Sequence, residues 1–98
     1  MIDGTYSFEV EVPFGRKTGS VTLRTEGDVA YADIDAPIIG KQHMEGQVEG
    51  DTFTAQGSKK IKLLGTVDYT LKGELIEDTL HITLHTSKGD FELEGVRV

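Results

Sequence analysis

Apolar and polar residues alternate with a period of two along most of this chain. The pattern is clearest in residues 67–75, 80–85 and 91–94, where almost every second residue is apolar. Such a period places all the apolar side chains on one face of an antiparallel sheet. No segment of ten residues shows a convincing helical periodicity. The pattern therefore predicts an all-β protein.

Glycine, proline and acidic residues interrupt the alternation at intervals that are typical of turns. Pro13-Phe14-Gly15 ends the first run, and Glu26-Gly27-Asp28 resembles a tight hairpin turn. The predicted strands are residues 4–12, 18–25, 29–35, 42–49, 52–57, 65–75, 80–86 and 91–98. The intervening residues 58–64 are predicted to form a connection.

Eight consecutive strands with short turns form an antiparallel up-and-down meander, which has two main outcomes. The meander can close into a small barrel, which removes the exposed strand edges. It can also stay half open, as a half-barrel or sandwich that pairs with a second copy. Both alternatives agree with the sequence.

The interior of an eight-stranded barrel is filled by side chains or holds one small ligand. The inward positions of the third to fifth strands are small, namely Ala30, Ala32, Gly46, Ala55 and Gly57. Small residues leave room for a cavity or permit close approach of a neighbouring backbone. We expect close packing to be the commoner reason.

The composition narrows the class of protein. A length of 98 residues corresponds to a single domain, residues 1–98. The net charge of −7 argues against general nucleic-acid binding, and the absence of cysteine excludes disulfides and thiolate chemistry. The first residues lack the basic and apolar regions that are typical of a signal peptide, and no apolar run reaches membrane-spanning length. We therefore expect a cytoplasmic protein, or a domain of a larger one.

Two short features lie at the ends of the chain. Gly4-Thr5-Tyr6 opens the first predicted strand, and Arg97 lies near the end of the last one. These strands are neighbours in a closed barrel, so the guanidinium can lie over the tyrosine ring. With these residues the chain resembles a reduced member of the calycin group, the lipocalins and fatty-acid-binding proteins. That group starts its first strand with Gly-x-Trp and packs a late arginine across the ring.

The resemblance implies a closed barrel that binds a small molecule. A further run, residues 46–53, is similar to turns in small bacterial β-domains and implies no function.

Charge is distributed unevenly between the two ends of the predicted barrel. In a meander, odd-numbered connections lie at one end and even-numbered connections at the other. The even connections carry acidic charges only, whereas the odd connections carry most of the ten Lys and Arg residues and no acid. These basic residues are Arg16, Lys17, Lys41, Lys59, Lys60, Lys62 and Lys88. The same end carries Phe14, Ile38, Ile39, Ile61, Leu63 and Leu64.

Barrels bind ligands at their mouths, so this combination predicts a non-catalytic binding module for an anionic amphipathic small molecule. Fatty acids, flavin nucleotides and acidic peptides all fit this description. The predicted ligand-binding residues are Phe14, Arg16, Lys17, Ile38, Lys41, Lys59, Lys60, Ile61, Lys62, Leu63 and Lys88.

The alternative function is a homodimerisation or protein-interaction domain without a small-molecule ligand. Monomeric proteins rarely expose a large apolar patch, so we expect a homodimer. The predicted interface residues are Val29, Tyr31, Ile38, Ile39 and Leu64.

Catalytic and metal-binding chemistry has little support in the sequence. His81 and His85 share a strand face but lie ~13 Å apart at the usual strand rise, whereas zinc needs ligand atoms ~2 Å from the ion. No Gly-x-Ser-x-Gly elbow and no glycine-rich phosphate loop are present. We therefore expect no enzymatic activity, no metal and no cofactor.

Overall fold

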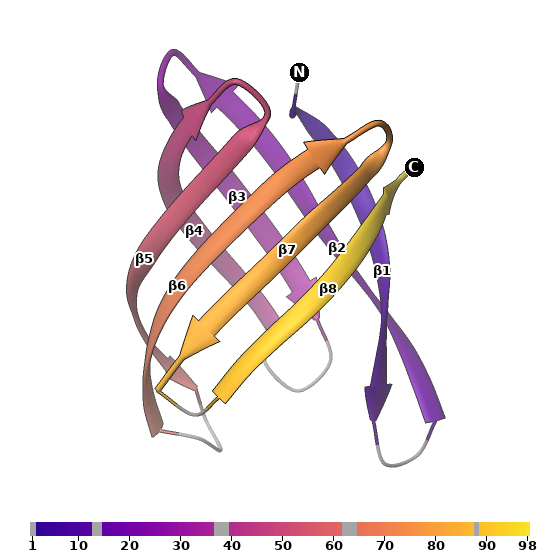
Figure 1. Ribbon diagram of the computed structural model, residues 1–98. Coiled ribbons are helices and arrows are strands. Elements are labelled where there is room, and N and C mark those ends of the chain that lie inside the picture. Colours follow the sequence, from indigo (N-terminus) through magenta and orange to yellow (C-terminus); the bar gives the residue numbers. More distant parts are fainter. Residues whose placement is uncertain (1, 13–14, 37–39, 62–64, 88) are drawn as a thin grey trace.

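The computed structural model of the chain describes residues 2–12, 15–36, 40–61, 65–87 and 89–98, with residues 10–12 and 61 described by their backbone alone. Eight antiparallel strands follow one another in sequence order around a closed barrel (Figure 1). The strands are β1 (Gly4–Val12), β2 (Gly15–Glu26), β3 (Val29–Ala36), β4 (Gly40–Glu49), β5 (Thr52–Ile61), β6 (Gly65–Ile76), β7 (Thr79–Thr86) and β8 (Gly89–Arg97). The predicted all-β meander is confirmed, and so is its closure, because Tyr6 of β1 lies opposite Arg97 of β8.

Several strands are longer than the alternation predicts. β2 begins at Gly15 rather than Thr18, and β4 begins at Gly40 rather than Gln42. β5 continues to Ile61, so the prediction that residues 58–61 belong to a connection was wrong. These residues stay extended because each is paired with β6, with Lys59 opposite Val67. Among the described residues no helix has the length and hydropathy that a membrane-spanning helix requires.

Three two-residue turns form the end of the barrel that we call the hairpin end. The first turn residue has a positive φ in each case, 61° at Gly27, 60° at Gly50 and 58° at Glu77. Glycine adopts such angles without steric cost and is favoured in tight hairpins. Glu77 is the one residue other than glycine with a positive φ in the described part of the chain.

The three hairpins are also locked to the sheet beyond them. In each turn the carbonyl oxygen of the aspartate accepts a hydrogen bond from a backbone amide of a strand further along the ring. The three bonds are Val48 N to Asp28 O at 2.9 Å, Leu75 N to Asp51 O at 2.9 Å, and Arg97 N to Asp78 O at 3.1 Å. These bonds satisfy turn carbonyls and brace the hairpin end as a continuous ring.

Replacing Glu77 with glycine should raise the free energy of unfolding by about 0.5–1 kcal/mol, because relief of the left-handed strain exceeds the flexibility cost of glycine. Urea denaturation measures the change. The reverse substitution, Gly50→Ala at the equivalent position, should destabilise the protein. A Glu77→Gly variant that is less stable than the wild type would show that strain at this turn is not limiting.

The core is concentrated behind the hairpin end. Its largest fully buried side chains are Ile2, Tyr6, Phe53 and Leu80, none more than 1 % exposed. The Tyr6 hydroxyl donates a hydrogen bond of 2.7 Å to the carbonyl oxygen of Ile2. Burial raises the pKa of the Tyr6 phenol, and the positive charge of Arg97 opposes this shift. The N-terminal residues therefore close this end of the barrel.

Asp3 completes the closure by holding the start of the chain against β2. Its carboxylate accepts hydrogen bonds from the hydroxyl of Thr25 at 2.7 Å and from the amide of Thr25 at 3.1 Å. The hydroxyl bond is the main cause of a lowered pKa of Asp3. The stability from this contact is therefore present above the ordinary pKa of Asp3 and is lost as the pH falls through the lowered value.

Candidate functional site

The barrel is paired unevenly around its circumference. β4 and β5 pair only through residues 47–49 and 52–54, and β1 and β8 only through residues 6–7 and 96–97. All other neighbouring strands pair over most of their length. Two four-stranded sheets, β1–β4 and β5–β8, therefore meet at the hairpin end and diverge toward the opposite end, which we call the mouth (Figure 1).

A cavity of about 70 Å³ lies inside the barrel and is lined by apolar residues. Phe53, Leu71 and Leu80 are buried and form its deep part, whereas Leu84 and Leu93 nearer the mouth are only half-buried. Its volume is roughly half that of a ~150 Å³ core cavity that accepts benzene in an engineered protein. Within the described interior, a long acyl chain or a flavin ring therefore does not fit as a whole.

The small inward residues serve both purposes that the sequence left open. A Cβ atom added to Gly46 would overlap the carbonyl oxygen of Thr54, so β4 and β5 approach each other closely there. Ala32, Ala36 and Gly73, in contrast, line the cavity. Of the small residues expected to point inward, Ala32 therefore borders the open space, whereas Gly46 and Gly57 have close neighbours, since a Cβ atom on Gly57 would lie 3.0 Å from the Tyr69 hydroxyl.

Five of the predicted basic residues belong to strands, and register divides them between two faces. Lys59 lies opposite the buried Val67 and is itself half-buried, whereas its neighbour Lys60 is exposed on the other face. On β2, Lys17 is two residues before the buried Gly19 and four before the buried Val21. Residues spaced by two share a face of a strand, so Lys17 also belongs to the inward-facing set, although it is itself exposed. The interior side of the mouth therefore carries Lys17 and Lys59.

The remaining two basic residues lie on the outer face close to carboxylates. The Arg16 guanidinium is 3.3 Å from the Glu9 carboxylate, and Lys41 lies opposite Asp35 in the β3–β4 register. The expected separation of basic residues from acids therefore applies to the connections but not to the whole end of the barrel. Tertiary pairing brings strand carboxylates next to them.

Other predicted site residues fall outside the part of the chain that the structure describes. These are Phe14, Ile38, Lys62, Leu63 and Lys88, together with the interface residues Ile39 and Leu64, while only the backbone of Ile61 is described. Of the predicted interface, Val29 is 41 % exposed. Tyr31 already has partners in its own chain, because Arg24 lies 5.0 Å from its ring centroid and His43 stacks on it at 6.2 Å.

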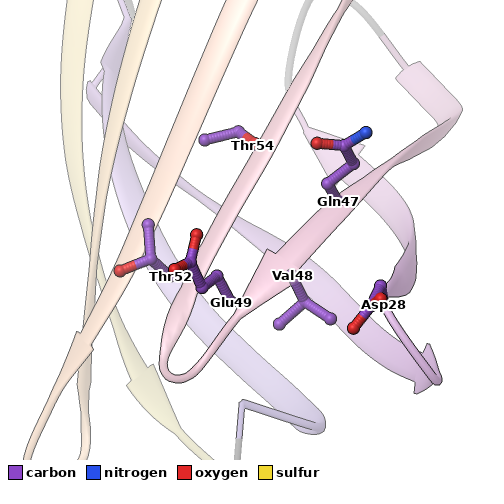
Figure 2. Close-up of a pocket in the computed structure, with 6 residues that line it drawn as sticks. All are labelled: Asp28, Gln47, Val48, Glu49, Thr52 and Thr54. Atoms are coloured by element: carbon purple, nitrogen blue, oxygen red, sulfur yellow. The ribbon is translucent and has the colours of Figure 1, made fainter.

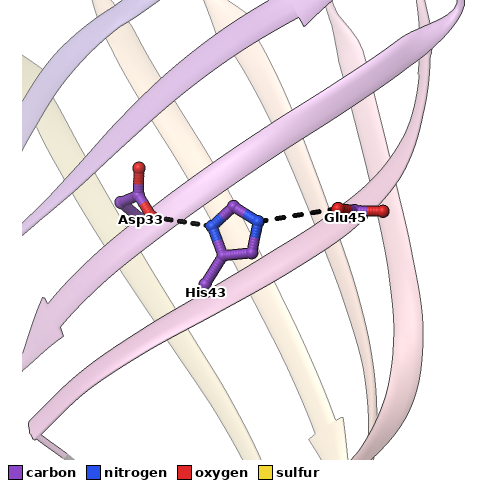
Figure 3. Close-up of polar contacts among 3 residues, drawn as sticks. All are labelled: Asp33, His43 and Glu45. Carbon is purple, nitrogen blue, oxygen red and sulfur yellow. Dashed lines mark hydrogen bonds and ion pairs between the residues drawn. The ribbon is translucent and has the colours of Figure 1, made fainter.

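The three histidines lie on the outer face, each beside a carboxylate. His43 is the most contacted, with Nδ1 2.7 Å from Asp33 and Nε2 3.8 Å from Glu45 (Figure 3). His81 and His85 contact Glu94 and Asp90 at 3.5 and 3.1 Å. Within the described residues no three His, Cys, Asp or Glu side chains are grouped so that they could hold a metal ion.

Sequence reasoning did not predict a second hollow on the outside of the β4–β5 hairpin. This groove of about 620 Å³ is lined by Asp28, Gln47, Val48, Glu49, Thr52 and Thr54 (Figure 2). All six are exposed or half-buried, and five are polar. Although it is larger than the interior cavity, the groove lacks an enclosed apolar wall, so we regard the interior and mouth as the better candidate site.

Comparisons with known proteins add no family to this description. A scan against models of protein families finds no match, and neither the curated proteins nor the solved structures contain one.

Proposed function

We propose that this barrel is a small, non-catalytic binding module of calycin type that takes an anionic amphipathic small molecule at its mouth. The observation that carries the proposal is an apolar cavity closed at the hairpin end and followed, toward the mouth, by an inward-facing, half-buried lysine. Lys59 lies four residues beyond Ala55 on β5, which is ~13 Å at the usual strand rise. A ligand with a narrow apolar tail of comparable length would place its anionic group near Lys59, with only the end of the tail in the cavity of about 70 Å³ and the rest along the mouth.

The energetics assign different roles to the two parts of such a ligand. Burial of apolar surface supplies most of the affinity. A partly exposed lysine contributes only about 0–1 kcal/mol, so it orients the ligand rather than holding it. The net charge of −7 repels anions at long range, so the attraction must act locally at the mouth.

Kinship with the calycin group is supported by one contact at the closed end. The guanidinium carbon of Arg97 lies 5.1 Å from the centroid of the Tyr6 ring. This is the ring-to-arginine arrangement that the Gly4-Thr5-Tyr6 and Arg97 resemblance implies.

A titration with decanoate, followed by NMR of the leucine methyl groups, tests the proposed function. Decanoate should shift the signals of Leu84 and Leu93, and Lys59→Gln should weaken its binding about threefold to fivefold. Lys60→Gln is the matched control, because the adjacent lysine lies on the outer face and its loss should leave the affinity unchanged. Decanol, which has no charge, should bind equally to the wild type and to Lys59→Gln.

Two results would refute the proposed function. One is the absence of methyl shifts at Leu84 and Leu93 up to millimolar decanoate. The other is an equal loss of affinity in Lys59→Gln and Lys60→Gln. The homodimerisation or interaction reading would then take precedence, and sedimentation of the wild type over a concentration series tests it.

A further inference from the structure

The divergence of β1 and β8 leaves two strand edges unpaired. The ladder between them consists of Tyr6 opposite Arg97 and Ser7 opposite Val96. Beyond these residues the described parts of the two strands form no further pairs, although β1 continues to Val12 and β8 begins at Gly89. Figure 1 shows the β1–β2 hairpin swinging away from β8 toward the mouth. We call the opening between these two edges the slit.

Backbone hydrogen-bonding groups point into the slit from both sides. The amide of Val98 donates to the carbonyl of Thr5 at 2.9 Å, so Thr5 faces β8. In antiparallel strands, alternate residues direct both N–H and C=O toward the same neighbour. It follows that Glu9 on β1, and Glu92 and Glu94 on β8, present unpaired donors and acceptors to the slit.

Charge explains why the chain does not fill the slit by itself. Continuing the observed register would place Glu9 opposite Glu94 and Glu11 opposite Glu92. Like charges directly opposite each other destabilise a strand pair. Arg16 and His81 contact Glu9 and Glu94 from their own sides, yet the side chains of these glutamates remain 65 and 71 % exposed. The glutamates along the β1 and β8 edges, which we call the acidic rims of the slit, therefore favour an open slit.

We propose that the slit binds an extended segment of a partner protein that alternates basic and apolar residues and adds as a strand to the free edge of β8. Strand addition uses the unpaired backbone groups for affinity and the alternating side chains for specificity. Basic residues of the segment lie beside Glu92 and Glu94 on the outside. Apolar residues lie on the inner side, near Phe91, which is 52 % exposed, and the half-buried Leu93.

The negative charges of the β8 edge also favour a basic segment over a second copy of this chain. Pairing of the β8 edge with the β8 edge of a second copy would bring Asp90, Glu92 and Glu94 against one another, which is unfavourable. A basic segment, in contrast, is attracted by the rims and by the net charge of −7. The inference does not depend on the proposed small-molecule function, because strand addition uses the backbone edge of β8 and its glutamates, although Leu93 borders both the slit and the cavity.

The test uses three acetylated and amidated synthetic peptides with the full chain. One alternates lysine and valine, one has the same residues in two blocks, and one alternates glutamate and valine. The lysine–valine alternating peptide should slow amide hydrogen exchange of Glu92 and Glu94 about tenfold. Exchange at Leu93 should not change, because its amide already faces β7. The double variant Glu92→Lys/Glu94→Lys should lose the protection, whereas Glu45→Lys/Glu74→Lys elsewhere on the outer face should keep it.

Each alternative outcome contradicts the proposal in a distinct way. Equal binding of the block peptide would show electrostatic attraction without strand addition. Protection of Glu92 and Glu94 that rises with protein concentration and needs no peptide would identify a second copy as the occupant. Absence of protection by the alternating peptide at low salt would show that the slit does not accept a strand.

Discussion

Replacing Gly46 with alanine is expected to lower the free energy of unfolding by about 1–3 kcal/mol, the usual cost of inserting a methyl group where there is no room. A Cβ atom at this position would overlap the backbone carbonyl of Thr54 and approach the Phe53 ring to 2.8 Å. The backbone cannot move aside without disturbing the short ladder between β4 and β5. Urea denaturation with and without the substitution measures the loss.

Gly73→Ala is the matched control for this prediction. Gly73 lies on the other side of Phe53, and its added methyl would be 3.5 Å from Leu80 Cδ1, an ordinary van der Waals distance. Its effect should therefore stay within about 0.5 kcal/mol. If both variants lost the same stability, steric overlap at Gly46 would not be the cause.

Replacing Arg97 with alanine is expected to destabilise the protein by about 2–3 kcal/mol, from a charge-assisted hydrogen bond and a cation–π contact. Nη1 of Arg97 donates to the carbonyl oxygen of Asp3 at 2.7 Å, and the guanidinium lies over the Tyr6 ring. The same side chain thus holds the N-terminal residues, β1 and β8 together at the closed end. Thermal and urea unfolding should both show the change, with faster amide exchange at Ser7 and Val96.

Arg24→Ala provides the comparison, since Arg24 lies 5.0 Å from the Tyr31 ring in a similar stacking contact on the outer face. An exposed contact of this kind is worth about 0.5–1 kcal/mol, so this variant should lose much less stability. Similar losses in both variants would mean that the hydrogen bond to Asp3 adds nothing.

The contacts that stabilise the fold lie at one end of the barrel, and both proposed binding sites lie toward the other. Locked hairpins, buried aromatic side chains and the Arg97 contacts lie at the closed end, whereas toward the mouth the β1–β8 and β4–β5 ladders stop and the leucines are only half-buried. Regions with few buried contacts open most easily and are where ligands and partners can enter. The variants Gly46→Ala and Arg97→Ala report on the closed end, and Lys59→Gln and Glu92→Lys/Glu94→Lys on the mouth.

The alternation of residues by itself determined the fold class and the order of the strands. A period of two is typical of an antiparallel sheet with one buried face, and the short turns between the runs place each strand beside the next one. Turn residues such as Gly27 and Gly50 fixed the hairpins, since they tolerate a positive φ. Tyr6 and Arg97 indicated closure, because strands at the two ends of a meander meet only in a barrel.

Only the tertiary structure decided how the mouth is built. Lys59 faces inward and Lys60 outward because β5 stays paired with β6 beyond residue 57. The sequence does not show this pairing, because the charged residues there hide the alternation of apolar and polar positions. The free edge of β8 begins where its pairing with β1 stops, and a continued register would bring Glu9 opposite Glu94, which is distant in sequence. The cavity volume depends on clearances between side chains of many strands, and local pattern carries no information about such distances.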